Sequence, residues 1–300
     1  MAILQIDQLQ KSYGRLRALK KLSLQVEPGQ VYGILGPNGS GKTTTLGIVL
    51  GIIQKDGGQF QWFDGRYGNN PRKRIGALLE TPNFYPYLSA ERNLDIVAHI
   101  KQIAAPKKTE LLQLVDLQER RHSPFRTYSF GMKQRLAIAA AMVGDPDVLI
   151  LDEPTNGLDP QGIAEIRATI LKIAERGKTI IMASHILDEV EKVCSHVAII
   201  KKGNLLASGT VGAILNQDVV IEIAAKDKQR LKELLARHPD ISHLEEKGPL
   251  LVAQAKQDIQ AASLNQMAFE QGIVLTHLLL RPKSLEAEFL EITQKAPNLD

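Results

Sequence analysis

The sequence is poor in cysteine and has no long apolar run. Cys194 is the one cysteine among 300 residues, which excludes an intramolecular disulfide and a metal site built from several cysteines. No stretch reaches the roughly 18 consecutive apolar residues that a membrane helix needs. The start of the chain, MAILQIDQLQ, lacks the charged opening and the apolar core of a secretion signal. These absences predict a cytoplasmic protein that reaches a membrane only through another protein.

The chain also lacks a strong charge of either sign. Its 37 lysines and arginines oppose 33 aspartates and glutamates, which leaves a net charge of +4. Such a small excess does not indicate a nucleic-acid partner, and we expect none. The basic runs at 71–74 and 119–122 are typical of solvated surfaces. With 44% hydrophobic residues, the chain is long enough for a sizeable core and a second, smaller domain.

Short apolar runs and helical patterns alternate through the first two thirds of the sequence. Period-two alternation and short apolar runs predict strands, whereas the longer apolar segment over 42–53 predicts a helix. Strands that alternate with helices indicate an α/β fold with a largely parallel sheet. The expected strands are 3–9, 23–30, 31–36, 59–63, 74–80, 147–153, 179–185 and a hairpin over 196–209.

Residues 88–143 change to a mostly helical character. The segments SAERNLDIVAHI and KKTELLQLVDL space leucine, isoleucine and valine as one face of a helix does. Ser89 stands where the N-cap of the first of these helices would lie. We therefore expect a helical insertion of about 88–143 within the first domain.

The segment after about residue 216 has another pattern. Its expected strands and helices follow the order β-α-β-β-α-β, as in a ferredoxin-like unit, and a last helix is expected over 284–294. The sequence thus predicts a first domain, 1–215, and a small α+β accessory domain, 216–300. His238 and His243 lie near a turn in this second part without an acidic or cysteine partner, so no metal site is expected there.

The stretch GPNGSGKT at residues 36–43 fits the pattern G-x-x-x-x-G-K-[ST]. Its glycines allow backbone N–H groups to turn inward around phosphate oxygens. Lys42 supplies a point charge for the β- and γ-phosphates, and the Thr43 hydroxyl is placed to reach Mg²⁺. An expected strand precedes the motif and an expected helix follows it, which is the context that the motif requires. The nucleotide-binding residues expected from it are Gly36, Pro37, Asn38, Gly39, Ser40, Gly41, Lys42, Thr43 and Thr44.

A second motif, VLILDEP at 148–154, ends an apolar strand in two carboxylates. In doubly wound sheets, ligands bind at the carboxyl ends of the strands. Asp152 is placed to hold Mg²⁺, and Glu153 to orient and deprotonate an attacking water molecule. Together with the phosphate loop, these residues predict hydrolysis of a nucleoside triphosphate.

In their order and spacing, these motifs resemble the ATPase subunit of an ATP-binding-cassette (ABC) transporter, over residues 1 to about 210. The resemblance implies a cassette with a mostly parallel sheet, an antiparallel β subdomain and the helical insertion. It implies ATP and Mg²⁺ as cofactors, and a head-to-tail dimer with itself or with a paired ABC ATPase. The type that it resembles is an exporter, in which a separate transmembrane permease would hold this subunit at the inner face of the cell membrane.

Three further site residues follow from the resemblance. Tyr13 in KSYG matches the aromatic residue that stacks on adenine; the alternative is an exposed tyrosine at the end of a strand. Asp159 in NGLD matches a loop that lies at the subunit interface and near the nucleotide. His185 in MASH matches the histidine that contacts the γ-phosphate and takes part in catalysis.

The stretch YSFGMKQRL at 128–136 resembles the signature sequence of the family. Ser129 and Gly131 would contact the γ-phosphate that is bound by the phosphate loop of the opposite subunit. A hydroxyl, a glycine N–H and a helix N-terminus are what such an anion requires. The stretch departs from the common LSGGQ form at Phe130, Met132 and Lys133, side chains that we expect to affect packing, since the anion-binding chemistry needs only Ser129 and Gly131.

Glu80 departs from the family, which has a glutamine at this position. The glutamate resembles the subset of exporters that handle lantibiotics, bacitracin and similar peptides. Because a carboxylate is a harder oxygen ligand than an amide, Glu80 is a candidate for both metal binding and catalysis. The aromatic residues Phe84, Tyr85 and Tyr87 that follow are either a contact for the permease or a small satellite core.

The alternative function is that of a soluble ABC ATPase in translation or DNA maintenance. Such proteins carry two cassettes per chain or a long coiled-coil insertion, and neither is apparent in this sequence. The exporter interpretation is therefore preferred. The sequence does not indicate which substrate is exported, because selectivity belongs mostly to the permease.

Overall fold

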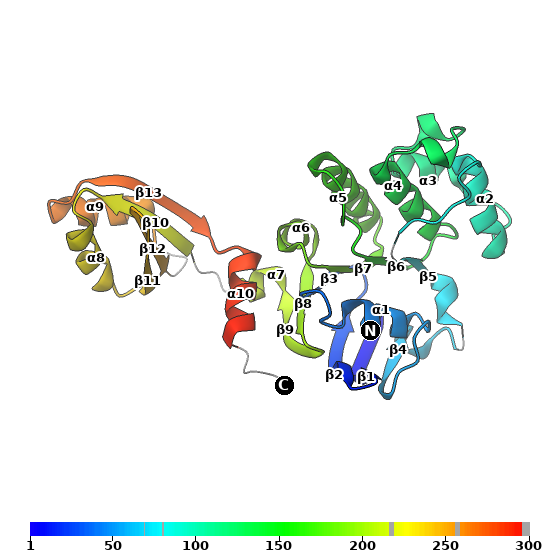
Figure 1. Cartoon of the computed structure of the whole chain (residues 1–300), viewed down its shortest axis with the longest axis horizontal. Coiled ribbons are helices and arrows are strands. Elements are labelled where there is room, and N and C mark those ends of the chain that lie inside the picture. Colours follow the sequence, from blue (N-terminus) through cyan, green and yellow to red (C-terminus); the bar gives the residue numbers. More distant parts are fainter. Residues whose placement is uncertain (69, 80, 216–218, 256–258, 296–300) are drawn as a thin grey trace. The chain divides into compact units, whose positions relative to one another are not determined.

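Two compact units make up the chain (Figure 1). One contains Met1–Thr210 together with the residues from Ile292 onward, and the other contains Val211–Glu291. The first unit thus ends a few residues before the boundary expected at 215, and the end of the last helix groups with it. The computed structural model describes residues 1–68, 70–79, 81–215, 219–255 and 259–295.

A six-stranded sheet forms the centre of the first unit. All neighbouring strands are parallel except the last two, which form the hairpin expected around Gly203. Every residue of β3, β6 and β7 is buried, which explains why these strands appear in the sequence as continuous apolar runs. In spatial order the strands are β5 (Ile75–Leu78), β6 (Val148–Asp152), β7 (Thr179–Ser184), β3 (Val31–Leu35), β8 (His196–Lys201) and β9 (Asn204–Thr210).

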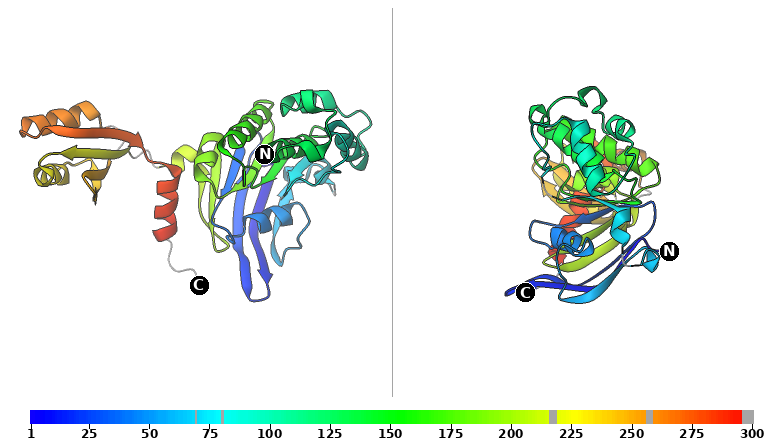
Figure 2. Two further views of the ribbon diagram at one scale, coloured as in Figure 1. Left: turned by 45° about the horizontal axis from the view of Figure 1, so that its top comes forward. Right: turned by 90° about the vertical axis from the view of Figure 1, so that its right-hand side faces the viewer.

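A three-stranded antiparallel sheet lies on one side of the central sheet, with helix α1 (Figures 1 and 2). Its strands are, in spatial order, β2 (Leu16–Val26), β1 (Leu4–Tyr13) and β4 (Gly57–Trp62). Leu46 and Ile48 of α1 are buried in the same core as Ile34 of the central sheet and Leu22 of the antiparallel sheet. This shared core explains how the antiparallel subdomain expected from the resemblance is held to the cassette.

Helix α1 (Lys42–Val49) is shorter than the expected 42–53. Gly51 adopts a left-handed φ of 73°, which ends the helix as glycine commonly does. The indole Nε1 of Trp62 donates a hydrogen bond of 2.8 Å to the carbonyl of Val49. That carbonyl belongs to the last turn, whose oxygens have no partner within the helix, so Trp62 stabilises the C-terminal end of α1.

The remaining helices of the cassette lie on the opposite side of the central sheet (Figure 1). As expected, Ser89 caps the first helix of the insertion, and its Oγ accepts a hydrogen bond of 3.3 Å from the Arg92 N–H. Lys101 donates to three carbonyls at the end of α4, and burial lowers the pKa of this lysine to about 8. The helices are α2 (Ala90–Ile100), α3 (Lys108–Leu114), α4 (Phe130–Ala141), α5 (Pro160–Glu175) and α6 (Leu187–Val193).

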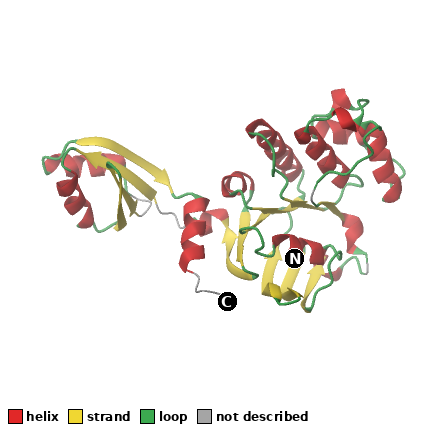
Figure 3. Cartoon of the chain, viewed as in Figure 1, coloured by secondary structure: helices red, strands yellow, loops and turns green. Residues whose placement is uncertain are grey.

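The second unit has a four-stranded antiparallel sheet in the expected element order (Figure 3). Buried leucines of α8 and α9 share one apolar core with Ile221 and Ile223 of the sheet, so both helices cover the same face. None of the helices among the described residues is long and apolar enough to cross a membrane. The elements from residue 211 onward are α7 (Val211–Ile214), β10 (Val219–Ala225), α8 (Lys228–Ala236), β11 (Ile241–Lys247), β12 (Leu250–Ala255), α9 (Ala261–Glu270), β13 (Leu275–Pro282) and α10 (Leu285–Lys295).

Separate cores predict separate unfolding transitions. Leu251 lies in the core of the second unit and Leu22 in that of the first, and both are fully buried. Replacing either leucine by alanine should lower the free energy of unfolding of its own unit by about 2–5 kcal/mol. In scanning calorimetry, Leu251→Ala should move only the transition of the second unit, and Leu22→Ala only that of the first. A single transition that both substitutions shift alike would contradict this expectation.

Candidate functional site

The phosphate loop connects the buried strand β3 to the start of α1. Gly41 has a φ of 110°, and a Cβ there would lie 2.6 Å from the carbonyl oxygen of Ala18. A Cβ on Gly36 would lie 2.2 Å from the carbonyl oxygen of Ile200. Glycine is therefore required at both positions by close approach of neighbouring backbone, and at Gly41 also by its left-handed conformation.

Lys42 is buried at the base of this loop, with 5% of its surface exposed. Its Nζ donates to the carbonyl of Gly36 at 2.8 Å and lies 3.3 Å from Oε1 of Glu153. The buried Oγ of Ser40 makes no hydrogen bond within the described part of the chain. A cation, an unsatisfied hydroxyl and the N-terminus of α1 thus converge on one loop, and this set of groups fits a phosphate group.

Glu153 and His185 meet at the carboxyl ends of two adjacent parallel strands. Asp152, the last residue of β6, pairs with Ala183 of β7, so the residues that follow lie close together. Oε2 of Glu153 is 2.8 Å from Nδ1 of His185 and accepts from the backbone N–H of that residue at 3.3 Å. Because its Oε1 pairs with Lys42, the Glu153 carboxylate connects the phosphate loop to His185.

Thr43 and Asp152 are suited to share a magnesium ion with a bound nucleotide. Thr43, the second residue of α1, is exposed, and Asp152 lies 5% exposed at the end of β6. No cluster of three or more metal-binding side chains occurs among the described residues. Magnesium commonly keeps several waters and uses one or two carboxylates together with substrate phosphates, so this donor set fits it. Glu80, the other candidate ligand and catalytic residue, lies outside the described residues.

Tyr13 stands at the end of β1, on the hairpin that touches the phosphate loop. Its ring is half-exposed, and Nζ of Lys11 lies 5.4 Å from the ring centroid. The returning strand of the same hairpin carries Ala18, whose carbonyl packs against Gly41. The hairpin thus approaches the phosphate loop through Ala18, and the exposed ring of Tyr13 stays a candidate surface for a base.

Ser129 and Gly131 form the start of α4, as the resemblance predicts. Ser129 is the N-cap, and its Oγ accepts from the Met132 N–H at 3.3 Å. A Cβ on Gly131 would find no atom closer than 3.7 Å, a distance of ordinary contact. The packing of its own chain therefore does not require glycine at this position.

Asp159 lies beside the start of α4, in the loop before α5. It is the N-cap of α5, and its Oδ1 accepts from the Gly162 N–H at 2.8 Å. Together with Ser129 and Gly131 it lines a cavity of about 400 Å³. Two helix starts thus border one open cavity at this end of the cassette.

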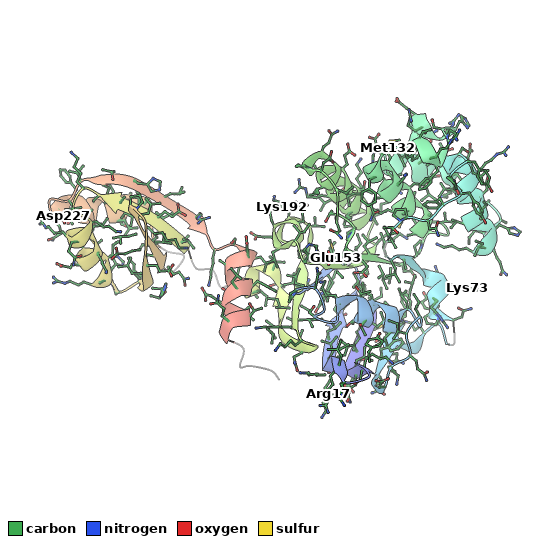
Figure 4. All side chains as sticks on the ribbon, in the orientation of Figure 1. Arg17, Lys73, Met132, Glu153, Lys192 and Asp227 are labelled. Atoms are coloured by element: carbon green, nitrogen blue, oxygen red, sulfur yellow. The ribbon has the colours of Figure 1, made fainter. Side chains whose placement is uncertain are left out.

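These residues form two groups, and the folded chain does not bring the groups together. Figure 4 shows Glu153 of the phosphate-loop group and Met132, next to Gly131, in separate parts of the first unit. Within the described residues, no hydrogen bond or ion pair joins Ser129 or Gly131 to the phosphate loop. One chain therefore presents two separate groups of candidate binding residues.

The aromatic residues after Glu80 divide between the two interpretations of the sequence. Phe84 packs on Phe125 with 5.2 Å between the ring centroids, as in a satellite core. Tyr85 and Tyr87 are 50% and 68% exposed and contact each other with their rings. The two tyrosines therefore form a surface, and Phe84 holds that surface on the insertion.

Asn93 is a residue of this region that sequence reasoning missed. It is buried, accepts from the Tyr85 N–H at 2.9 Å, and donates to the carbonyls of Tyr85, Leu88 and Ser89. Such a set of bonds holds the loop of the tyrosines in one conformation. An asparagine at an inward-facing position of an amphipathic helix is the signal that could have identified it.

Comparison with known proteins agrees with this geometry. A family model described as "ABC transporter" matches residues 19–156. The bacitracin transport ATP-binding protein BcrA of Bacillus licheniformis is 37% identical over 97% of this chain and 97% of its own length. The Nod factor export ATP-binding protein I of Ralstonia nicotianae is 33% identical, over 97% of this chain and 94% of its own.

A solved structure shares the fold. That of cbiO1 from Clostridium perfringens, described as part of the ABC transporter complex cbiONQ, superimposes with a TM-score of 0.64 and 28% identity. The match covers 79% of this chain and 96% of that one. The chain therefore belongs to the ABC transporter family, as an ATP-hydrolysing, ATP-binding subunit that groups with the export type.

Proposed function

We propose that two cassettes of this kind, either two copies or this chain and a paired ATPase, bind two MgATP between them head to tail. The supporting observation is the separation of Ser129 and Gly131 from the phosphate loop within one chain. Gly131 has room for a side chain in its own chain, so its glycine is explained by the close approach of a group from outside. A phosphate bound by the opposite cassette is such a group, since α4 begins there.

Each residue of the phosphate-loop group has a distinct role in this proposal. Lys42 and the backbone of the loop bind the β- and γ-phosphates, and Thr43 with Asp152 holds Mg²⁺. The bound metal would neutralise the charge that develops on the phosphates. Glu153 orients and deprotonates the attacking water. His185 contacts the γ-phosphate and also positions the Glu153 carboxylate through the 2.8 Å contact.

The proposal includes a separate membrane permease, through which the dimer lies at the inner face of the cell membrane and drives export. The exposed pair Tyr85 and Tyr87 is the surface that we assign to the permease. Exposed aromatic residues on a rigid loop suit a protein contact, because they bury much area at a small entropic cost. The second unit, Val211–Glu291, would serve as an accessory domain, since each proposed nucleotide contact precedes it.

Replacing Glu153 by glutamine tests the assignment of the base. The amide keeps the shape of the side chain and cannot accept the proton of the water. ATP hydrolysis should fall about 10²–10⁴-fold, while MgATP binding persists and a closed dimer accumulates. Steady-state hydrolysis, nucleotide binding and sedimentation with ATP measure these three quantities. Turnover near that of the unsubstituted protein would assign the base to another residue.

Mixing two inactive variants tests whether each ATP site is composite, that is, built from the phosphate loop of one chain and the signature sequence of the other. Lys42→Ala damages the phosphate loop and Gly131→Asp damages the signature, so a mixed dimer retains one intact site. Hydrolysis should return to roughly a quarter of the normal rate, since about half of the dimers are mixed and each has one of two sites intact.

The matched control for this mixture combines Lys42→Ala with Glu153→Gln. Both substitutions lie in the same group of residues, so no mixed dimer retains an intact site and no activity should return. If the first mixture stays inactive while sedimentation shows mixed dimers with ATP, the composite site is wrong.

Replacing Glu80 by glutamine should affect coupling more than nucleotide binding. At about 4 Å and an effective dielectric near 20, loss of one charge beside Mg²⁺ changes the interaction by about 4 kcal/mol, most of which desolvation offsets. A few-fold fall in basal turnover is expected, with a larger fall in permease-stimulated turnover. Equal falls in both would make Glu80 a metal ligand only, and no change in either would leave it without a role.

A further inference from the structure

Three aromatic rings, those of Phe84, Phe125 and Tyr128, form a row that ends at the start of α4. The row begins in the loop that carries Tyr85 and Tyr87, which we call the tyrosine loop. The ring of Phe84 packs on Phe125 with centroids 5.2 Å apart and an interplanar angle of 67°. Phe125 in turn packs on Tyr128 at 6.0 Å and 45°. Such tilted and edge-to-face arrangements are favourable for aromatic pairs. Tyr128 directly precedes Ser129, the N-cap of α4.

Phe125 also contacts α4 itself. Nζ of Lys133, in the first turn of that helix, lies 5.4 Å from the centroid of the Phe125 ring. A cation at this distance from a ring face is attracted to it. Phe125 is buried, with 6% of its surface exposed. Its ring therefore contacts both Phe84 and the first turn of the signature helix.

The backbone follows the same route as the rings. The Phe125 N–H donates to the carbonyl of Leu88, and the Arg126 N–H to that of Pro86, each at 2.9 Å. Ser89 and Pro124 form a β-bridge beside these bonds. The segment before α4 is thus bonded along the tyrosine loop, so the two segments are held as one body.

The end of this body is the cap that we place against the phosphate of the opposite cassette. Met132 N–H donates to Oγ of Ser129 at 3.3 Å, and Lys133 N–H donates to the Ser129 carbonyl at 3.0 Å. A shift or rotation of Tyr128 changes the position of the next residue in the chain, Ser129. Any change that the tyrosine loop passes to Phe84 therefore has a direct mechanical route to the hydroxyl of Ser129.

We infer that Phe125 is a positioning residue that connects the tyrosine surface to the anion-binding start of α4. The inference rests on the proposed function, in which Tyr85 and Tyr87 contact the permease. The permease would then act on the nucleotide held by the opposite chain through Phe84, Phe125 and Tyr128. A direct effect on the phosphate loop of the same chain is not needed for this route.

Hydrogen–deuterium exchange on the full-length protein tests this connection without nucleotide or permease. Phe84→Leu removes the outer ring of the row, at a partly buried position where leucine keeps an apolar side chain and the fold should survive. The amides of Met132 and Lys133 should then exchange about tenfold faster, because loss of one ring pair shifts a local opening equilibrium by about that factor. Exchange in the buried strand β6 should stay the same.

Tyr85→Leu is the matched control. Tyr85 belongs to the same loop, but its ring contacts Tyr87 and is not part of the row. This variant should leave exchange at Met132 and Lys133 within about twofold of the unsubstituted protein, as surface substitutions usually do. Equal effects of the two variants at the start of α4 would overturn the inference. It would also be overturned if Phe84→Leu sped exchange only in the tyrosine loop, or equally in α4 and β6.

Lys133 provides a second, independent variant. Lys133→Gln removes the cation over Phe125 and should also speed exchange at the start of α4, whereas Lys133→Arg keeps a cation and should restore slow exchange. If the glutamine and arginine variants behave alike, the contact of Phe125 with α4 has no positioning role and the inference fails.

Failure of this inference is distinguishable from failure of the proposed function. Permease contact is tested separately by Tyr87→Ser, which should reduce permease-stimulated hydrolysis and leave the exchange of Met132 unchanged. Loss of stimulation in Tyr87→Ser without an exchange effect in Phe84→Leu refutes the ring route only. Normal permease-stimulated hydrolysis in Tyr87→Ser refutes the proposed permease contact. It then also refutes the inference that the ring row carries the effect of the permease to the start of α4.

Discussion

The carboxylate of Glu153 holds together the parts of the cassette on which the site depends. It pairs with Lys42 of the phosphate loop and with His185 after β7, and these three residues are far apart in the sequence. Glu153 itself has a left-handed φ of 48°, a strained conformation that persists only where the surroundings enforce it. The fully buried strands β3, β6 and β7 supply that enforcement, so the apolar core and the charged site stabilise each other's geometry.

The fold was predictable where a local pattern determined it. The buried central strands were recognised because each is a continuous apolar run with a turn signal at its end. The strand expected at 23–30 instead begins at Leu16, because its pairing with β1 shifts register several times and Lys21 has a φ of 60°. Bulges of this kind break the period-two pattern from which strands are recognised.

The site was predictable to the extent that its chemistry lies in short motifs. Lys42 and Ser129 were identified as candidates because each stands in a motif whose residues are adjacent in the chain. Asn93 and Phe125 were missed because their roles arise from contacts with Tyr85, Phe84 and the start of α4, which the sequence separates. The sequence could not show that Gly131 has room for a side chain, because that depends on which atoms of the folded chain surround it.

Trp62 gives the protein an optical property that follows from its place in the fold. It is the one tryptophan in the sequence, it is 4% exposed, and its indole is bonded to the last residue of α1. The first residue of that eight-residue helix is Lys42, the cation of the phosphate loop. A displacement of α1 upon ATP binding would therefore alter the surroundings of the indole, and the intrinsic fluorescence of the unlabelled protein would report occupancy of its own nucleotide site.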